Sequence, residues 1–181
     1  MDHGALLYRR FLDGEEQAFD ELLQTFREPL TLFLCRYVSD YHTAEDLSID
    51  AFTWLLVHPR HYNFKTPFKT YLFMIGRSRA LDYCKHRAKI KFTDLEEVQA
   101  ADPDTPETLH IKGERVQALY RAIASLPSEQ AAVIHLVYFE DQSYEQVARV
   151  LHKSRKQIDN LLYRAKKELR SILGEEGRTL L

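Results

Sequence analysis

Two capping-box patterns lie only eleven residues apart near the end of this chain of 181 residues. Ser143 with Gln146 predicts the start of one helix, and Ser154 with Gln157 predicts the start of the next. The first helix must therefore be short, and a tight turn must join it to the second. From Lys153 to Arg170 there are seven Lys or Arg and two acids, a local charge of +5. The sequence thus predicts a short helix, a turn and a basic second helix.

This pattern is typical of a helix-turn-helix that reads DNA, because the second helix of that motif carries a basic outer face. An ordinary helical hairpin with a solvated charged face would have the same pattern. Apolar residues recur on one face of the second helix: Ile158, Leu161, Leu162, Ala165, Leu169 and Ile172. The opposite face is polar and basic: Lys156, Asn160, Tyr163, Lys167 and Arg170. The pattern alone leaves both interpretations open.

Helical signals dominate the rest of the chain, and no segment has the alternation of a strand. We expect an all-α fold. A first short helix should stop at Gly14, and longer helices should span about residues 15–38 and 43–58, the latter opened by Thr43 as cap. After a loop over 59–66, Thr66 and Pro67 predict a helix to about residue 89. Two further helices are expected over about 108–126 and 127–139.

The charge distribution divides the chain. Residues 1–91 carry a net charge of +1, residues 92–112 of −5, and residues 113–174 of +3. The acidic segment contains two prolines and is typical of a linker. We therefore expect two small helical domains, 1–91 and 113–174, joined by an acidic linker over 92–112 and followed by a tail over 175–181. The second domain ends in the helix-turn-helix.

No enzyme chemistry is indicated. The six glycines are scattered and form no phosphate-binding loop, and His58 and His61 have no cysteine or paired carboxylate beside them. Neither a cofactor nor a metal is predicted. Cys35 and Cys84 are expected to be core thiols in a reducing compartment. No apolar run reaches membrane-spanning length, so we expect a cytoplasmic protein without membrane insertion.

Four sequence blocks, in order, resemble a known family. In the first half they are FLDGEEQAFDELLQTF at 11–26, AEDLSIDAF at 44–52 and PFKTYLFMIGRSRALDYCKHR at 67–87. The fourth runs from ALYRAIASLPSEQ at 118 through SRKQIDNLLYRAKKEL at 154–169. The chain resembles bacterial RNA polymerase sigma factors of the extracytoplasmic-function (ECF) type, which keep only the second and fourth sigma regions. The resemblance implies a protein that binds core polymerase and directs it to promoters.

The resemblance also implies the site residues. In the family, a helix with the AED-L pattern grips the clamp of the polymerase β′ subunit, and the matching residues are Asp46, Leu47, Asp50 and Phe52. Leu47 and Phe52 should pack inward. Ile49 stands where the family usually has Gln. Without the resemblance, the two carboxylates would only favour a helix near its N-terminus.

The family's loop before its third helix, together with that helix, reads the −10 element and captures a flipped base. The matching residues are Tyr62, Asn63, Phe64, Lys65, Lys69, Arg77, Ser78 and Arg79. We expect Tyr62 and Phe64, in a polar loop, to be exposed and to stack on bases, and the basic residues to contact phosphates. Phe68 and Tyr71 are expected in the core. Ser78 stands where the family commonly has Asn.

The helix-turn-helix of the family reads the −35 element. The matching residues are Ser154, Arg155, Lys156, Asp159, Asn160, Tyr163, Arg164 and Lys167. Asp159 and Leu161 replace basic residues that the family usually has. Asp159 could accept a hydrogen bond from a cytosine amino group, or pair with Arg155 or Tyr163 at helical spacing. The residues leave these alternatives open.

The implied partners are core RNA polymerase, through its β′ clamp and β flap, promoter DNA, and a separate anti-sigma factor. The acidic linker is either a solvated tether or, as in the family, a segment that enters the RNA channel of polymerase. An alternative function also fits the residues: a helix-turn-helix regulator whose N-terminal domain binds a different protein partner.

Overall fold

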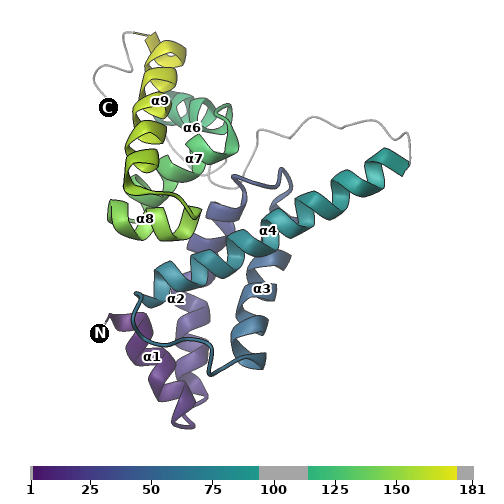
Figure 1. Cartoon of the computed structure of the whole chain (residues 1–181), viewed down its shortest axis with the longest axis vertical. Coiled ribbons are helices and arrows are strands. Elements are labelled where there is room, and N and C mark those ends of the chain that lie inside the picture. Colours follow the sequence, from purple (N-terminus) through teal and green to yellow (C-terminus); the bar gives the residue numbers. More distant parts are fainter. Residues whose placement is uncertain (1, 94–113, 175–181) are drawn as a thin grey trace. The chain divides into compact units, whose positions relative to one another are not determined.

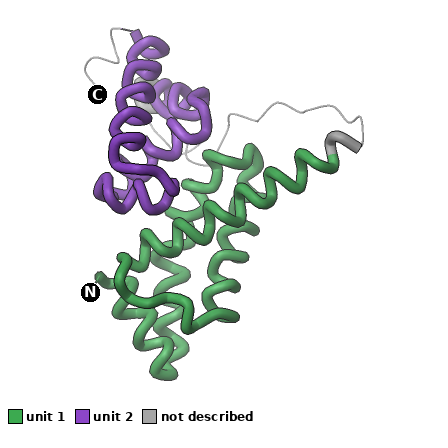
Figure 2. The backbone as a smooth tube through the Cα atoms, in the orientation of Figure 1, with its two compact units in different colours: residues 1–98 green, residues 99–181 purple. Residues whose placement is uncertain are grey.

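A computed structural model describes residues 2–93 and 114–174, and these residues contain helices and no strand. The chain divides into two compact units, residues 1–98 and 99–181 (Figures 1 and 2). The all-α fold is confirmed. Of the expected linker, 92–112, only the first two residues are described, and they belong to a helix. The expected tail, 175–181, lies outside the described residues.

The described residues of the first unit form four helices: α1 (His3–Leu12), α2 (Gln17–Leu34), α3 (Tyr41–Val57) and α4 (Phe68–Thr93). Each matches a predicted helix within a few residues. The helix α2 packs against the other three, and α4 is long enough to extend beyond the bundle that α1, α2 and α3 make with its first half (Figure 1). None of the helices in the described part of the chain is both long and apolar enough to cross a bilayer.

Two aspartates cap the helices of the first unit. The Asp2 carboxylate accepts hydrogen bonds from the backbone N–H of Ala5 at 3.0 Å and of Phe68 at 3.1 Å, so it caps α1 and α4 together. Asp40 accepts from the backbone N–H of Thr43 at 2.8 Å. The prediction that Thr43 caps α3 was therefore wrong. Because the Asp40 carboxylate accepts from both the amide and the hydroxyl of Thr43, the helix begins two residues earlier.

The core of the first unit is rich in aromatic rings. The Phe33 ring lies 5.1 Å from the Phe73 ring, and the Phe68 ring lies 5.4 Å from that of Tyr8. A side chain at Gly4 would place its Cβ 2.7 Å from the Phe68 ring, so glycine permits the close approach of α1 and α4. The fully buried rings come from all four helices: Tyr8, Phe33, Phe52, Phe68 and Phe73.

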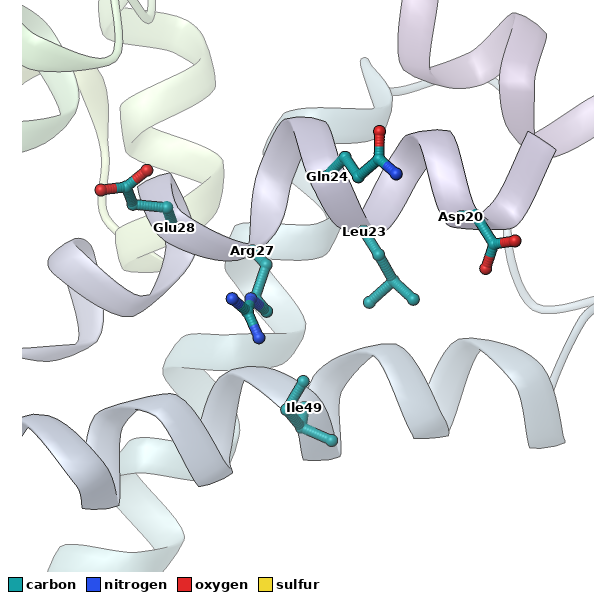
Figure 3. Close-up of a pocket in the computed structure, with 6 residues that line it drawn as sticks. All are labelled: Asp20, Leu23, Gln24, Arg27, Glu28 and Ile49. Carbon is teal, nitrogen blue, oxygen red and sulfur yellow. The ribbon is translucent and has the colours of Figure 1, made fainter. Parts of the chain in front are cut away.

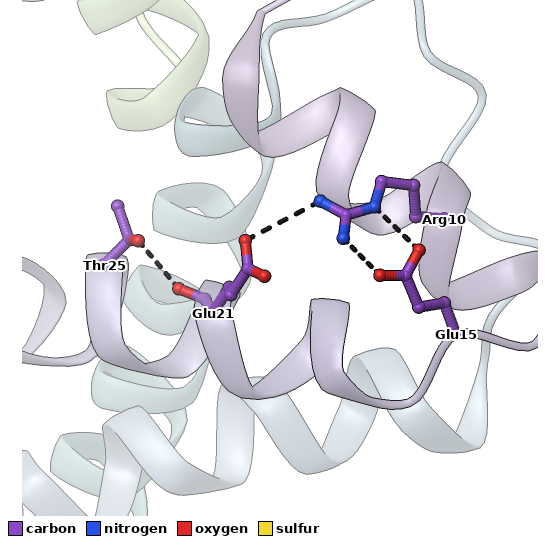
Figure 4. A network of polar contacts seen from close by, with 4 residues as sticks. All are labelled: Arg10, Glu15, Glu21 and Thr25. Carbon is purple, nitrogen blue, oxygen red and sulfur yellow. Dashed lines mark hydrogen bonds and ion pairs between the residues drawn. The ribbon is translucent and has the colours of Figure 1, made fainter.

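Charged side chains fix the turn between α1 and α2 (Figure 4). The Arg10 guanidinium binds the Glu15 carboxylate through two hydrogen bonds and lies 3.7 Å from Glu21. The hydrogen bond to Arg10 lowers the pKa of Glu15. Further along α2, the Thr25 hydroxyl donates to the Glu21 carbonyl oxygen at 2.7 Å. This network is exposed, so it orients the turn more than it stabilises the fold.

The two cysteines are half-buried in the first unit and form no disulfide. The thiol of Cys84 donates to the carbonyl oxygen of Tyr37 at 3.5 Å, and burial raises its pKa. The prediction that both are core thiols is only partly met, because each side chain lies at the edge of the core and is half-buried.

The second unit contains α6 (Glu114–Ala124), α7 (Ser128–Ile134), the π-helix η1 (His135–Phe139), α8 (Tyr144–Leu151) and α9 (Arg155–Leu173). The predicted helix over 127–139 is confirmed in extent, although its last turn is a π-helix. There the buried His135 ring meets the Glu140 carboxylate at 3.2 Å. The predicted start at Thr108 lies outside the described residues.

Both predicted capping boxes are present. Gln146 and Gln157 each accept from the backbone N–H of their serine, at 2.6 and 2.7 Å, and the serine hydroxyls accept in return at 3.3 Å. Between the two helices, His152 adopts the left-handed conformation at φ 51°, which turns the chain within three residues. The predicted helix-turn-helix is therefore confirmed as α8 and α9.

Candidate polymerase and nucleic-acid interfaces

The helix α3 separates its predicted residues into two faces. Leu47 and Phe52 are 7% and 2% exposed, and the Phe52 ring meets the Phe19 ring edge-on at 6.1 Å. Their predicted inward packing is confirmed. Asp46 and Asp50 are exposed one helical turn apart, and Ile49 lies between them with 40% of its surface exposed. The outer face of α3 thus presents two carboxylates and one apolar side chain.

A groove of about 580 Å³ lies beside this face, between α2 and α3. In Figure 3, Leu23 of α2 and Ile49 of α3 point toward each other, while Asp20 and Glu28 lie toward its two ends. Gln24 and Arg27 complete the lining, and Arg27 pairs with Glu45 at 3.7 Å across the two helices. Sequence reasoning missed this groove, although the spacing of Asp20, Gln24 and Glu28 places them on one face of α2.

The prediction that Tyr62 is an exposed loop residue was wrong. The residue is 3% exposed. Its ring stacks on Tyr71 at 4.9 Å and meets the Tyr8 ring edge-on at 5.7 Å, and its hydroxyl donates to the Thr66 carbonyl oxygen at 2.7 Å. Desolvation by this burial raises the pKa of Tyr62. Tyr62 therefore anchors the loop to the core and is not available for stacking on a base.

The residues of the loop that follow Tyr62 are less buried than this anchor. Phe64 has φ 62°, an uncommon conformation for a bulky residue, and its half-buried ring lies 4.6 Å from Tyr62 and 4.8 Å from the Arg9 guanidinium. Asn63 and Lys65 are exposed, and the Asn63 side chain accepts from the backbone N–H of Lys65 at 3.0 Å. The loop thus has a fixed backbone and two exposed polar side chains.

The predicted residues of α4 do not share one environment. Ser78 is exposed, and Lys69 and Arg79 are half-buried. Arg77 is only 9% exposed, and its Nε donates to the Tyr37 hydroxyl at 3.2 Å. The expectation that Arg77 presents its charge to phosphates was therefore wrong. Its side chain instead joins α4 to the segment that follows α2. Phe68 is fully buried, as predicted, and Tyr71 is half-buried.

Sequence reasoning missed a cluster of rings at the end of α3. The Trp54 ring stacks on His58 at 4.7 Å, and it lies 5.3 Å from His61 and 6.3 Å from Tyr71. His61 is exposed and Trp54 half-buried. The spacing of Trp54 and His58, one helical turn apart, was the available signal. Among the described residues no three metal-ligating side chains come together, and the two histidines lie in this cluster as packed rings.

The outer face of α9 is as predicted. Lys156, Asp159, Asn160, Arg164 and Lys167 are exposed, and Tyr163 is 70% exposed. Ile158, Leu162, Ala165 and Leu169 are buried on the opposite face. Leu161 lies at the boundary and is half-buried. The Ser154 hydroxyl is engaged as the cap of α9.

Arg155 has a different environment from the other basic residues of α9. It pairs with Glu145 of α8 and lies 3.6 Å from Asp159, and its guanidinium lies 4.6 Å above the Tyr144 ring. Of the alternatives that the sequence leaves open for Asp159, the pairing with Arg155 is the one present.

Comparison with known proteins agrees with this division into units. Residues 22–90 match the family model described as Sigma-70 region 2, and residues 116–169 match the model described as Sigma-70, region 4. The chain belongs to the sigma-70 factors of the ECF type, and it directs promoter-specific transcription initiation. Sigma factors are initiation factors and not enzymes. The match to region 2 argues against the alternative function, a helix-turn-helix regulator whose N-terminal domain binds a different protein partner.

Several curated relatives match over most of their length. The chain is 26% identical over 170 residues to the ECF sigma factor SigX of Bacillus subtilis, covering 89% of this chain and 88% of SigX. It is 23% identical to SigM of the same organism, covering 84% of this chain and 93% of SigM. The ECF sigma factor RpoE of Cereibacter sphaeroides is 29% identical over 136 residues, 74% of each chain.

Solved structures share the fold. The sigma factor RpoE from Bartonella quintana, solved with the anti-sigma factor NepR, matches with a TM-score of 0.71 at 21% identity, covering 87% of this chain and 97% of RpoE. CnrH, solved with the cytosolic domain of CnrY, matches with a TM-score of 0.67 at 20% identity, covering 95% and 97%.

Proposed function

We propose that the outer face of α3 binds the β′ clamp of core RNA polymerase. The observation that carries this proposal is the pair of exposed carboxylates, Asp46 and Asp50, beside the groove between α2 and α3. A helical partner with basic side chains would meet these carboxylates, and one of its apolar side chains would contact Leu23 and Ile49 in the groove. Leu47 and Phe52 hold the face in place from inside.

Reversing both charges tests this interface. The D46K/D50K variant should lose association with core polymerase, because two attractive contacts become repulsive. The matched control is D13K/D82K, which makes the same charge change at two exposed residues of the same unit that do not line the groove. Helicity by circular dichroism should be unchanged in both. Equal polymerase binding by D46K/D50K and the control would refute the proposal.

We propose further that the −10 element is read by the loop before α4, through Asn63, Phe64 and Lys65, together with Lys69, Ser78 and Arg79 of α4. Flipping a base costs a few kcal/mol, and stacking on an aromatic ring can offset about 1–3 kcal/mol of that cost. Phe64 is the half-exposed ring of the loop. Trp54 contacts both His61 and Tyr71, and Tyr71 places these rings near the same end of α4. The buried Tyr62 supports the loop from below.

A loop exchange tests this proposal. Residues 63–65 are replaced by those of a related sigma factor while Tyr62 and Thr66 are retained, so that the anchor of the loop stays intact. Transcription from a promoter library with a randomised −10 element should then show altered base preference, with unchanged affinity for core polymerase. The same preferred bases in the exchange would place the −10 pocket elsewhere.

We propose that α9 reads the −35 element, with Asn160 and Tyr163 toward the bases and Lys156, Arg164 and Lys167 on phosphates. Replacing any one of these three basic residues by Ala should reduce the slope of log K against log salt by about 0.9, because it removes one phosphate neutralisation. The matched control is Lys166→Ala, because Lys166 lies 5.2 Å from the Tyr138 ring on another face of α9. If all four variants kept the slope of the wild-type protein, this face would not touch DNA.

Partners beyond the clamp follow from the family. RpoE and CnrH were solved with an anti-sigma factor and a cytosolic partner domain, and we propose that a separate anti-sigma protein likewise controls this chain in the cytoplasm. The second unit would in addition bind the β flap of polymerase. An anti-sigma protein that covers the outer face of α3 should compete with core polymerase, and simultaneous binding of both would exclude that mode of control.

A further inference from the structure

The guanidinium of Arg155 is surrounded by side chains from two helices. From α8 come the Glu145 carboxylate, which pairs with the Arg155 Nη1, and the Tyr144 ring, whose centroid lies 4.6 Å from the Arg155 Cζ. From α9 comes Asp159, whose Oδ1 lies 3.6 Å from the Arg155 Nε. The planar guanidinium can bind carboxylates on two edges while its face covers a ring, which a lysine cannot do. These contacts join the two helices of the helix-turn-helix beside the entrance of α9.

The charges of this cluster bear on DNA binding. Two carboxylates flank one guanidinium, so the three side chains sum to a charge of −1. Hydrogen bonds from its own backbone N–H and from Arg155 lower the pKa of Glu145, which keeps that carboxylate ionised. Two unscreened carboxylates at the entrance of a recognition helix would repel the phosphates of DNA. Arg155 is the positive charge that screens both.

Lys156, the next residue after Arg155, is not engaged by any carboxylate in the described part of the chain. Lys156 is exposed and has no ion pair with any residue in the described ranges 2–93 and 114–174. Its charge is therefore available for a phosphate, whereas the charge of Arg155 is already engaged by two carboxylates. Adjacent basic residues at the start of one helix thus have different environments, and only one of them resembles a phosphate contact.

We propose that Arg155 is a positioning residue: it fixes the start of α9 to α8, and Glu145 and Asp159 hold its charge away from promoter phosphates. Asp159 then binds Arg155 and does not read a cytosine. This inference rests on the proposed reading of the −35 element by α9. Asp159, which stands where the family usually has a basic residue, therefore has a role within the protein. The affinity of α9 for DNA is consequently lower than its number of basic residues suggests.

The test measures binding of the full-length protein to a short −35 duplex over a range of salt concentrations. The E145Q/D159N variant should release Arg155 to a phosphate, so the slope of log K against log salt should become steeper by about 0.9 and binding at low salt should tighten several-fold. The matched control is E168Q, which removes an exposed acid of the same helix that does not touch Arg155. Its slope should stay at the wild-type value.

The R155A variant completes the test. It should weaken binding without reducing the slope, because the two carboxylates lose their screen while every phosphate contact is retained. In the R155A background, E145Q/D159N should no longer steepen the slope. Circular dichroism checks that each variant keeps its helices.

Two results would overturn the inference while leaving the proposed function standing. One is a slope reduced by about 0.9 in R155A, which would make Arg155 a phosphate contact. The other is a changed base preference at a single promoter position in D159N, which would make Asp159 a reader of that base. Unchanged slopes in K156A and K167A would instead show that α9 does not touch DNA, and would overturn the proposed function and this inference together.

Discussion

The two units of this sigma factor differ in the aromatic content of their cores. The first unit buries eight Phe and Tyr residues: Tyr8, Phe19, Phe26, Phe33, Phe52, Tyr62, Phe68 and Phe73. Among the described residues of the second unit no Phe, Tyr or Trp is buried, and the buried apolar side chains are those of Ala, Val, Ile and Leu. Its aromatic residues Tyr138, Phe139 and Tyr163 are exposed instead.

The difference explains how each unit positions its proposed DNA-binding residues. In the first unit a continuous contact of rings links Trp54, Tyr71, Tyr62 and Phe64, so the loop before α4 depends on the core. In the second unit, the two helices of the helix-turn-helix start at capping boxes and are joined on the surface by Arg155 and Glu145. Core substitutions should therefore disturb the first unit most, and substitutions at helix ends should disturb the second.

The largest expected effect is in the aromatic core. Phe68→Ala should destabilise the first unit by about 3–5 kcal/mol, because it leaves a cavity among the rings of Tyr8, Phe26 and Tyr62. Urea unfolding followed by circular dichroism measures the change. Phe139→Ala, at an exposed ring of the second unit, is the control and should change stability by much less. Equal losses in both variants would remove the distinction between the two cores.

The second effect is a loss of stability at alkaline pH that is confined to the first unit. Burial, followed by the nearby Tyr71, raises the pKa of Tyr8 from 10.0 to about 12, and burial also raises the pKa of Tyr62. Because both pKa values are raised in the folded state, this stabilisation is complete below pH 10 and should be lost as the pH rises through about 12.

Tyr8→Phe should flatten this alkaline loss, since it removes one of the two ionising groups. It should also cost about 1 kcal/mol at neutral pH, because the Tyr8 hydroxyl lies within hydrogen-bonding distance of the Leu55 and Pro59 carbonyl oxygens, at 3.1 and 3.2 Å. Urea unfolding of wild type and variant over pH 7 to 12 gives both quantities. A parallel pH dependence of the two proteins would contradict the assignment to Tyr8.

A smaller effect is expected at the helix ends of the second unit. Ser154→Ala removes the hydroxyl that accepts from the backbone N–H of Gln157, and should cost about 1 kcal/mol. The control Ser78→Ala replaces an exposed serine inside α4 and should change stability by less than about 0.5 kcal/mol. If both substitutions had the same small effect, the capping boxes would not determine the stability of the second unit.

The smallest effect is a gain. His152 ends α8 in the left-handed conformation, which strains any residue with a Cβ, so His152→Gly should stabilise the second unit by about 0.5 kcal/mol. Thermal unfolding would register this as a small upward shift. A loss of stability would show that the exposed imidazole makes a favourable interaction that outweighs the strain.

The features that sequence could predict are local. Ser143 with Gln146 and Ser154 with Gln157 are three residues apart, and both capping boxes are present as predicted. The inward packing of Leu47 and Phe52 was implied by the family resemblance and is likewise confirmed.

The features that sequence missed depend on distant partners. Tyr62 lies between polar neighbours in sequence, yet it is buried by Tyr8 and Tyr71, one of them in the first helix of the chain. From the sequence, Arg155 resembles a phosphate contact. In the structure it pairs with Glu145, which lies across the turn. The groove that includes Leu23 and Ile49 requires α2 and α3 to be packed together. None of these contacts could be derived from the spacing within one helix.

We propose that the two units divide the work: the outer face of α3 binds core polymerase, and the outer face of α9 binds the −35 element. The decisive experiment measures the affinities of two full-length variants for core polymerase and for a −35 duplex. D46K/D50K should lose polymerase and keep DNA, and K156A/R164A/K167A should lose DNA and keep polymerase. Loss of both affinities in either variant, with its helices intact, would contradict this division.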